Sequence, residues 1–487
     1  MPVNFAPPNA AEMMRFLPEI ILTIVATAVM VLESMTGDGD KTFLAGLSFA
    51  GLAAALCAAL AAQTDPGFAF QNMLIVDGFA TFFRVLVIAV GMLTILCANN
   101  YLRLESHNCG EFYALVLFSV AGQSIMVSAN ELIMIFIGLE IASISSYILA
   151  GFLRDDKRNN ESALKYFLLG SFATAFLLYG VAWIYGMTGA TNLMAIRDAI
   201  LKDPPPALAV AGAAALMLVG FAFKVSAVPF QSWAPDVYQG APAPVSAFMS
   251  AGPKAAAFAI FLRVFTVSFG SIAERWEPVV WVVALATMIL GNFAALSQTN
   301  IKRLLAYSSI ANAGYVLVAV TTHTEVATGA AMFYLASYAF MNIGAFAVVT
   351  HVARKGEKYT EIADFAGLGV RQPGTALLLT IFLLSMIGVP LTGGFIGKFY
   401  IFKAALDAHL IWLSILGLLN SAVAAYYYLK IIVVMYMHEA PAEGSELPPL
   451  AGGLRTALWV SAAGTFFLGI FPSALIEFAG RSASLLK

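Results

Sequence analysis

Long apolar runs follow one another along this chain and leave it few possible folds. An α-helix needs about 20 apolar residues to cross the ~30 Å hydrocarbon core of a bilayer. Helices also satisfy their backbone hydrogen bonds within one segment, as hydrocarbon requires. We therefore predict an all-α polytopic membrane protein with about 14 transmembrane helices. The apolar runs lie near residues 15–34, 43–62, 78–98, 111–129, 132–152, 162–187, 207–230, 243–268, 277–297, 303–321, 326–352, 375–400, 410–436 and 455–477.

Composition excludes several classes of function. Apolar residues make up 60% of the 487 positions and charged residues only 11%, whereas a soluble domain is ~25% charged. A formal net charge of −2 provides no basic stripe for nucleic acid. The cysteines form no paired spacing and the histidines are scattered, so we expect no metal, haem or iron–sulfur ligation by this chain. These residues are Cys57, Cys97, Cys109, His107, His323, His351, His409 and His438.

Basic residues in the connections predict the orientation. Short loops rich in Lys and Arg tend to stay on the cytoplasmic side, and the basic segments 154–158, 301–303 and 351–358 all fall in odd-numbered loops. With an even number of spans, both termini are then expected on the non-cytoplasmic side. The N-terminal stretch has no basic region and leads directly into a span, so we expect no cleaved signal. The longest polar stretches, 188–206, 353–374 and 437–454, are expected to be loops.

A few ionisable residues lie inside the apolar runs: Glu140, Lys165, Lys224, Lys254 and Lys398. A charge at membrane depth costs at least ~2.5–3.5 kcal/mol, so each must be paired, hydrated, neutralised or near an interface. The first of the lysines lies near the start of its run, where reaching the headgroups explains it as well as a function does. The others lie deeper and indicate a functional site.

Four further cations are expected to reach the membrane surface or to bind partners. They are Arg84, Arg263, Lys403 and Lys430.

Two of the buried lysines share a local pattern with a nearby proline. The element G-F-x-x-K occurs at 220–224 and at 394–398, in the seventh and twelfth spans. Pro229 leaves the carbonyl of Val225 without its helical partner, and Pro390 does the same to Met386. Interrupted backbone at membrane depth must be satisfied by protein or by water in a cavity, so a lysine beside such an interruption indicates a hydrated site.

Copies that lie five spans apart enter from opposite faces, as in the inverted repeats of many transporters. We therefore expect discontinuous helices at spans seven and twelve and a division into four parts. Residues 1–110 form an N-terminal three-helix segment, 111–270 and 271–437 form two inverted five-helix repeats, and 438–487 form a C-terminal loop and last helix.

Four segments carry a family resemblance: "ESALKYFLLGSF" (161–172), "FKVSAVPFQSWAPDVYQGAPAPVSAFMSAGPKAAAF" (223–258), "NIKRLLAYSSIANAGY" (300–315) and "GVPLTGGFIGKF" (388–399). Between about residue 70 and residue 440 the chain resembles the N-subunit family of the proton-pumping NADH:quinone oxidoreductase, respiratory complex I. These are antiporter-like membrane subunits. The resemblance implies proton translocation without a redox site in this chain, because other subunits hold NADH, flavin, iron–sulfur clusters and quinone. It also implies the M-type antiporter-like subunit and the small K-type subunit as partners, in a bacterial inner membrane.

The resemblance also implies roles for the buried charges. Glu140 matches the glutamate of the fifth span and Lys224 its lysine partner in the seventh. Lys254 matches the central connecting lysine, Lys398 the lysine that faces the outer exit, and Lys165 a further lysine of the polar axis. Burial disfavours an ammonium group and a nearby carboxylate favours it, so moving or shielding the glutamate would switch its partner between holding and releasing a proton.

Two positions depart from the family pattern. Gln231 and Asn312 stand where many relatives have histidine, so a relay here must use other groups or water. The hydroxyls of Tyr147, Tyr307, Ser308 and Ser309 are candidates to support that water, although hydroxyls at helical spacing are more often simple packing contacts.

Two alternatives remain open from the sequence. An Mrp-type or free-standing cation/proton antiporter subunit would need several carboxylates to coordinate a cation, and this interior offers essentially Glu140. A scaffold that helps to form quinone or lipid contacts would tolerate neutral side chains at the buried lysines.

Overall fold

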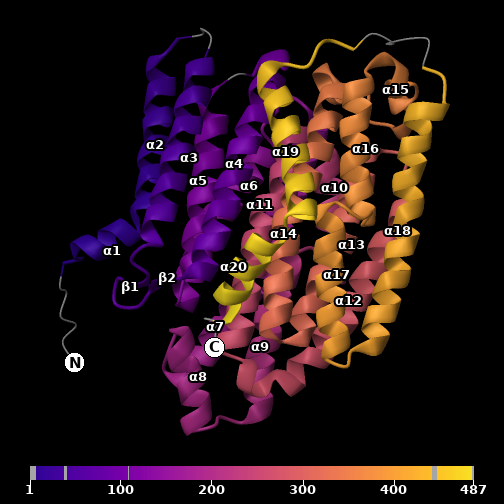
Figure 1. Ribbon diagram of the computed structural model, residues 1–487. Coiled ribbons are helices and arrows are strands. Elements are labelled where there is room, and N and C mark those ends of the chain that lie inside the picture. Colours follow the sequence, from indigo (N-terminus) through magenta and orange to yellow (C-terminus); the bar gives the residue numbers. More distant parts are fainter. Residues whose placement is uncertain (1–6, 38–40, 108, 441–446, 485–487) are drawn as a thin grey trace.

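The computed structural model describes residues 7–37, 41–107, 109–440 and 447–484 as a bundle of helices (Figure 1). The α-helices in these residues are α1 (Ala10–Arg15), α2 (Leu17–Met35), α3 (Thr42–Ala62), α4 (Gly78–Leu104), α5 (Gly110–Ser128), α6 (Leu132–Ala150), α7 (Lys157–Thr188), α8 (Leu193–Lys202), α9 (Ala207–Lys224), α10 (Trp233–Gly240), α11 (Ala243–Val267), α12 (Ala273–Leu296), α13 (Ile301–Thr322), α14 (Glu325–Ala353), α15 (Leu368–Arg371), α16 (Pro373–Ile387), α17 (Gly393–Asp407), α18 (Ile411–Met437), α19 (Gly452–Ile470) and α20 (Ser473–Ser484). Short 3-10 helices lie at Gly270–Ile272, Lys355–Glu357 and Ile362–Phe365, and the strands β1 (Gly67–Ala69) and β2 (Leu74–Val76) pair antiparallel.

The predicted membrane-spanning helices are confirmed. Among the described residues, 13 helices are long and apolar enough to cross a membrane. The predicted span near 375–400 is built from two shorter helices, α16 and α17, of 15 residues each. Counted together as one crossing of the membrane, α16 and α17 bring these 13 helices to the predicted total of about 14 spans. The polar break at 128–131 is also present, because α5 ends at Ser128 and α6 begins at Leu132.

The two predicted helix interruptions are confirmed as well. The seventh span stops at Lys224, and the chain resumes helical structure at Trp233 in α10. The twelfth span stops at Ile387, after which Gly388 adopts a positive φ of 97°, and α17 begins at Gly393. Each interruption contains the proline that cannot donate a backbone hydrogen bond.

Three details of the expected boundaries are wrong. The stretch 188–206 is not all loop: it contains α8, because the Asn192 side chain caps the amides of Met194 and Ala195. The stretch 353–374 likewise contains two 3-10 helices and α15. The last predicted span, 455–477, ends early at Ile470, since Pro472 separates α19 from α20. The third expected loop, 437–454, lies partly outside the described residues.

Three helices form the centre of the bundle. In α11, α13 and α14, 94% of the residues in the membrane-spanning window are buried, compared with 28% in α2 and 39% in α18. Figure 1 shows α2 and α18 at opposite edges of the molecule, with α14 between them. Side chains that the three central helices carry are therefore enclosed by protein and not by lipid.

Candidate functional site

Lys224 is held by hydroxyl groups at the point where the seventh span is interrupted. Its Nζ donates to Ser143 Oγ at 2.7 Å and to Tyr147 Oη at 3.2 Å, both on α6. It is the last residue of α9, where the helix dipole favours a cation. A small cavity of ≈ 20 Å³ lies beside Ser143 and Lys224, and one water needs roughly 10–15 Å³ on that scale. The amine thus has neutral partners and room for one water.

Glu140 lies on the same face of α6 but does not touch Lys224. It precedes Ser143 by three residues and Tyr147 by seven, so all three point to one side of the helix. Its Oε1 is buried without a hydrogen-bond partner, and no ion pair joins it to Lys224 among the residues described. The two predicted partners are therefore neighbours, with the lysine bound about one turn further along the helix.

Lys254 is the most deeply buried of the predicted lysines. It lies in α11 and is 2% exposed. Its Nζ donates to the carbonyl oxygen of Ser309 at 3.1 Å and also to the hydroxyl of that residue, on α13. Within the described chain no carboxylate pairs with it. A cation enclosed in this way is costly unless it is neutralised or further solvated.

Lys398 occupies the second interruption. Its Nζ donates to the carbonyl oxygens of Met386 and Ile387 at 2.7 and 3.1 Å, and to Ser421 Oγ at 2.9 Å. The first of these carbonyls is the one that Pro390 was predicted to leave free. The ammonium group thus takes the place of the missing backbone donors at the C-terminal end of α16, and it lies 4.6 Å from the centre of the Tyr315 ring.

Lys165 lies apart from these three. It is 41% exposed and forms ion pairs with Glu161 at 2.7 Å and with Asp236 at 2.8 Å. Arg303 pairs with the same aspartate at 2.6 Å. Together they line a wide cavity of ≈ 960 Å³ on the face formed by the odd-numbered loops. The structure places this predicted site residue at the surface end of α7, where its charge is compensated by two acids.

A network of hydroxyl and amide groups lies between α12, α13, α14 and α18. Asn312 donates to the carbonyl of Ser308 at 2.8 Å, and its side-chain oxygen accepts from the hydroxyl of Tyr334. Ser308 in turn bonds the hydroxyl of Tyr428. Asn312, which stands where many relatives have histidine, therefore joins this network through its side-chain amide.

The same network continues toward Lys398. Tyr427, whose ring lies 4.4 Å from that of Tyr428, donates to Asn292 at 3.1 Å. Asn292 contacts Tyr315 at 3.4 Å, and that ring faces the ammonium of Lys398. Sequence reasoning missed these tyrosines and Asn292, because their only signal is a polar group within an apolar run, which many packing residues share.

The other candidates from the sequence fall into place separately. The hydroxyls of Tyr147, Ser308 and Ser309 take part in the contacts above, whereas the ring of Tyr307 lies 5.8 Å from the guanidinium of Arg303 near the cavity. Gln231 has a buried side-chain oxygen without a partner among the described residues.

No group of three or more His, Cys, Asp or Glu able to hold a metal occurs in the described parts of the chain.

Two arginines expected at the membrane surface are instead fully buried. Arg84 pairs with Glu19 at 2.8 Å, and Arg263 holds Asp77 through two hydrogen bonds of 3.0 and 2.9 Å. Each has an acid of its own inside the protein, so neither needs to reach the interface. Lys403 and Lys430 are exposed, as expected.

The chain is similar to known proteins along almost its whole length. A family model described as "NADH:quinone oxidoreductase/Mrp antiporter, TM" matches residues 129–424. A protein of Solibacter usitatus named NADH-quinone oxidoreductase subunit N 1 is 60% identical over 479 residues, which cover 98% of this chain and 99% of the relative. The subunit N of Trichlorobacter lovleyi is 45% identical over 478 residues, covering 96% of both chains.

Solved structures show the same fold. A chain of respiratory complex I from Thermus thermophilus matches with a TM-score of 0.81 and 33% identity, over 94% of this chain and 98% of that one. A chain of the Mrp complex from Dietzia sp. matches with a TM-score of 0.84 and 22% identity, over 98% and 97% of the two chains. At 22% identity, the match to the Mrp complex chain shows a shared fold and nothing more.

Proposed function

The chain belongs to the NADH:quinone oxidoreductase/Mrp antiporter family, and on this premise we propose that it is a proton-translocating membrane subunit of a multi-subunit NADH:quinone oxidoreductase. Protons pass along Glu140, Lys224, Lys254 and Lys398. Redox chemistry in other subunits supplies the energy.

The observation that supports this proposal most strongly is the chemistry of the lysine partners. Lys224, Lys254 and Lys398 are all held by hydroxyl or carbonyl oxygens. A carboxylate partner would fix the ammonium form, because losing the proton would leave an unpaired buried charge. Neutral oxygens accept hydrogen bonds from both the ammonium and the amine, so each lysine can gain or lose a proton without breaking an ion pair.

Lys254 and Lys398 differ in the number of hydrogen-bond acceptors around the lysine nitrogen. An ammonium group has three N–H donors and a neutral amine has two. Lys398 has three protein acceptors, which matches the ammonium form. Lys254 has two, both on Ser309, which matches a neutral amine or an ammonium that also binds one water. A proton would therefore be retained more readily at the end of the line than at its centre.

Glu140 supports a gating role for Lys224. Its unpartnered Oε1 is a buried acceptor that calls for a water or a cation. If the lysine side chain swings by one helical turn from Ser143 toward the glutamate, it gains a carboxylate partner and holds its proton. When it returns to the hydroxyls, the proton is easier to release.

A cation/proton antiporter is less well supported by this interior. Selective binding of a hard cation needs several oxygen ligands, commonly carboxylates. Besides Glu140, the buried acids Glu19 and Asp77 are already bound by arginines.

The assembly follows from the same premise. We place the chain in a bacterial inner membrane with its odd-numbered loops on the cytoplasmic side, beside other antiporter-like and small membrane subunits of M type and K type. The electron carriers belong to the remaining subunits. Spans five apart carry the two interruptions, which supports a division into two inverted repeats, 111–270 and 271–437.

The test is NADH-driven proton uptake into inverted membrane vesicles whose complex carries Lys224→Met. We expect uptake to be lost while the complex still assembles, because a thioether cannot carry a proton. Assembly is measured on the same membranes, and cation/proton exchange is assayed beside it. The matched control is Lys403→Met, an exposed lysine paired with Asp407 at 3.0 Å, which should leave uptake unchanged.

Three results would contradict the proposal in different ways. Normal uptake in the Lys224→Met complex would make this lysine structural. Loss of exchange alone would favour an antiporter. Normal uptake after neutral substitutions at Lys254 and Lys398 as well would favour a scaffold.

A further inference from the structure

The large cavity on the odd-loop face is rich in carboxylates. Of the residues that the structure describes, six acids line it, against four Lys or Arg side chains: Glu105, Asp155, Asp156, Glu161, Asp236 and Glu357 against Lys157, Arg158, Lys165 and Arg303. With a volume of ≈ 960 Å³ it has room for many waters. An excess of negative charge in a concave site raises the local concentration of cations, protons included.

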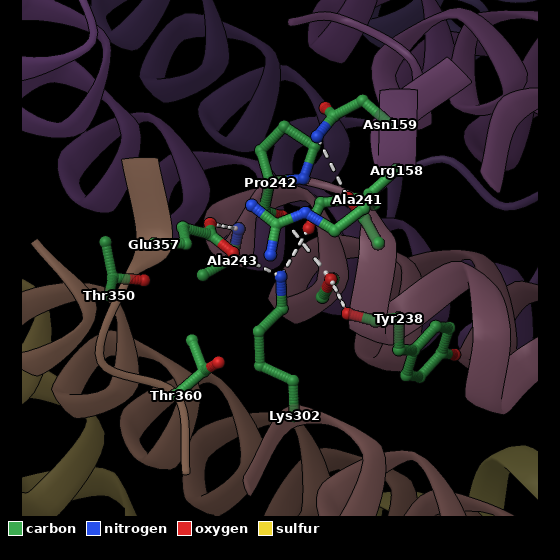
Figure 2. A network of polar contacts seen from close by, with 12 residues as sticks. Arg158, Asn159, Tyr238, Ala241, Pro242, Ala243, Lys302, Thr350, Glu357 and Thr360 are labelled. Carbon is green, nitrogen blue, oxygen red and sulfur yellow. Dashed lines mark hydrogen bonds and ion pairs between the residues drawn. The ribbon is translucent and has the colours of Figure 1, made fainter. Parts of the chain in front are cut away.

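At its inner wall the cavity meets a buried ion pair. Glu357 lines the cavity, and its carboxylate binds Lys302, which does not line it and is 1% exposed. Figure 2 shows the ammonium between this carboxylate and the carbonyl of Ala241. The glutamate also accepts from Tyr101 Oη at 2.9 Å and from the amide of Ala243 at 2.7 Å. Glu357 therefore links the cavity to a buried lysine.

From Lys302 the same helix leads inward to Lys254. Ser309 follows on α13 seven residues later, so it lies on the same face about 10 Å further along the axis. That serine holds Lys254. The hydroxyls of Tyr238 and Tyr338 lie beside that of Ser309 and interact with it, but neither buried Oη atom reaches the geometry of a full hydrogen bond with a described residue. Buried hydroxyls of this kind are normally satisfied by water.

We propose that Glu357 and Lys302 form a proton inlet that connects the acidic cavity to Lys254 through water bound at Tyr238 and Tyr338. This inference rests on the proposed function and adds the place where protons leave the water on this face. The ligands of the site are protons and the water molecules that carry them.

The transfer balances one proton at each step. Glu357 takes a proton from cavity water, which removes the negative partner of Lys302. Lys302 then gives one of its own protons, by way of water and the tyrosine hydroxyls, to the neutral amine of Lys254. The proton on Glu357 passes to Lys302 and restores the ion pair. The net result is one proton moved from the cavity to Lys254.

The first test is Glu357→Gln in the assembled complex, again with NADH-driven proton uptake. The amide oxygen keeps an acceptor for Lys302 and Ala243 but cannot carry a proton at this position. We expect uptake to fall about a hundredfold, the lower end of what a positioned proton-transfer group contributes. Glu361→Gln is the matched control: it changes the same type of side chain four residues on, outside the cavity, and should keep normal uptake.

A second variant keeps the proposal testable if the first fails to assemble. Tyr238→Phe removes a hydroxyl that makes no full hydrogen bond with a described residue, so packing is retained while the bound water loses an anchor. Slower uptake in an intact complex supports the inlet. Normal uptake in this variant, or in Glu357→Gln, overturns it.

Chemical rescue separates proton transfer from a positioning role. In Glu357→Ala, formate added on the odd-loop side should restore part of the uptake, because the cavity admits a small carboxylic acid that carries the proton instead. Failure of formate at concentrations that leave the unaltered complex active would count against the inlet. If Lys254→Met abolishes uptake while Glu357→Gln does not, the proposed function stands and this inference falls. If neither substitution has an effect, the proposed function itself fails.

Discussion

Lys224 is bound by neutral hydrogen-bond acceptors and lies beside a small cavity. Replacing it with another cationic side chain can therefore test whether it must release a proton. Its Nζ is bound by Ser143 and Tyr147, beside a cavity of ≈ 20 Å³. A residue that acts only as a fixed positive charge tolerates another cation. One that must release a proton does not tolerate arginine, whose guanidinium stays protonated in proteins.

We therefore expect Lys224→Arg to assemble and to lose NADH-driven proton uptake. Loss occurs although the charge is kept, because the proton cannot leave. Lys403→Arg, on the exposed surface, is the control for the substitution itself. Uptake that survives Lys224→Arg would assign the lysine an electrostatic role without proton release. The measurement is the initial rate of uptake, normalised to the amount of assembled complex.

Among the secondary-structure elements, α16 and α17 form a pair that approaches very closely at one glycine. A Cβ added to Gly394 would lie 2.0 Å from the carbonyl oxygen of Ser385, and the Gly394 amide bonds the Ser385 hydroxyl at 3.2 Å. Only a glycine allows the two helices to approach this closely. Their approach brings Lys398 within reach of the carbonyls that end α16.

Gly394→Ala should separate the two helices and remove these carbonyls from Lys398. Overpacking against backbone costs about 1–3 kcal/mol, and we expect both a lower thermal midpoint of the purified complex and reduced proton uptake. Gly374→Ala is the control, since no atom lies within 4 Å of the added carbon. Equal midpoints for the two variants would show that the close approach is not required for stability.

The interruptions were predictable from sequence, whereas the contacts across them were not. Proline chemistry is local, so the free carbonyl of Met386 followed from Pro390 alone. Which donor binds this carbonyl could not be predicted, because Lys398 reaches it only through the packing of α17 against α16. The position of Lys224 away from Glu140, and the burial of Arg84 against Glu19, likewise depend on packing between helices distant in sequence. Hydropathy predicts which segments cross the membrane, but it does not predict which polar atoms meet.

Across the whole molecule, a buried ion pair joins the start of α4 to α11, two helices far apart in the sequence. Asp77 caps α4 by accepting from the amide of Ala80 at 2.6 Å. It also accepts two hydrogen bonds from Arg263, which lies in α11, the helix of Lys254. The side chains are 9% and 3% exposed. One carboxylate thus fixes the start of one helix and holds it against another.

Removing the arginine alone should be more damaging than removing both charges. Arg263→Met leaves Asp77 as an unpaired buried charge, and breaking such a pair costs about 3–5 kcal/mol. Adding Asp77→Asn neutralises that charge while asparagine still caps α4, because it is as good an N-cap as aspartate. We expect the double variant to recover part of the lost thermal midpoint, measured on the purified complex with assembly followed by native gel. If the double variant is no more stable than Arg263→Met, the destabilisation comes from lost packing around the guanidinium and not from the unpaired carboxylate.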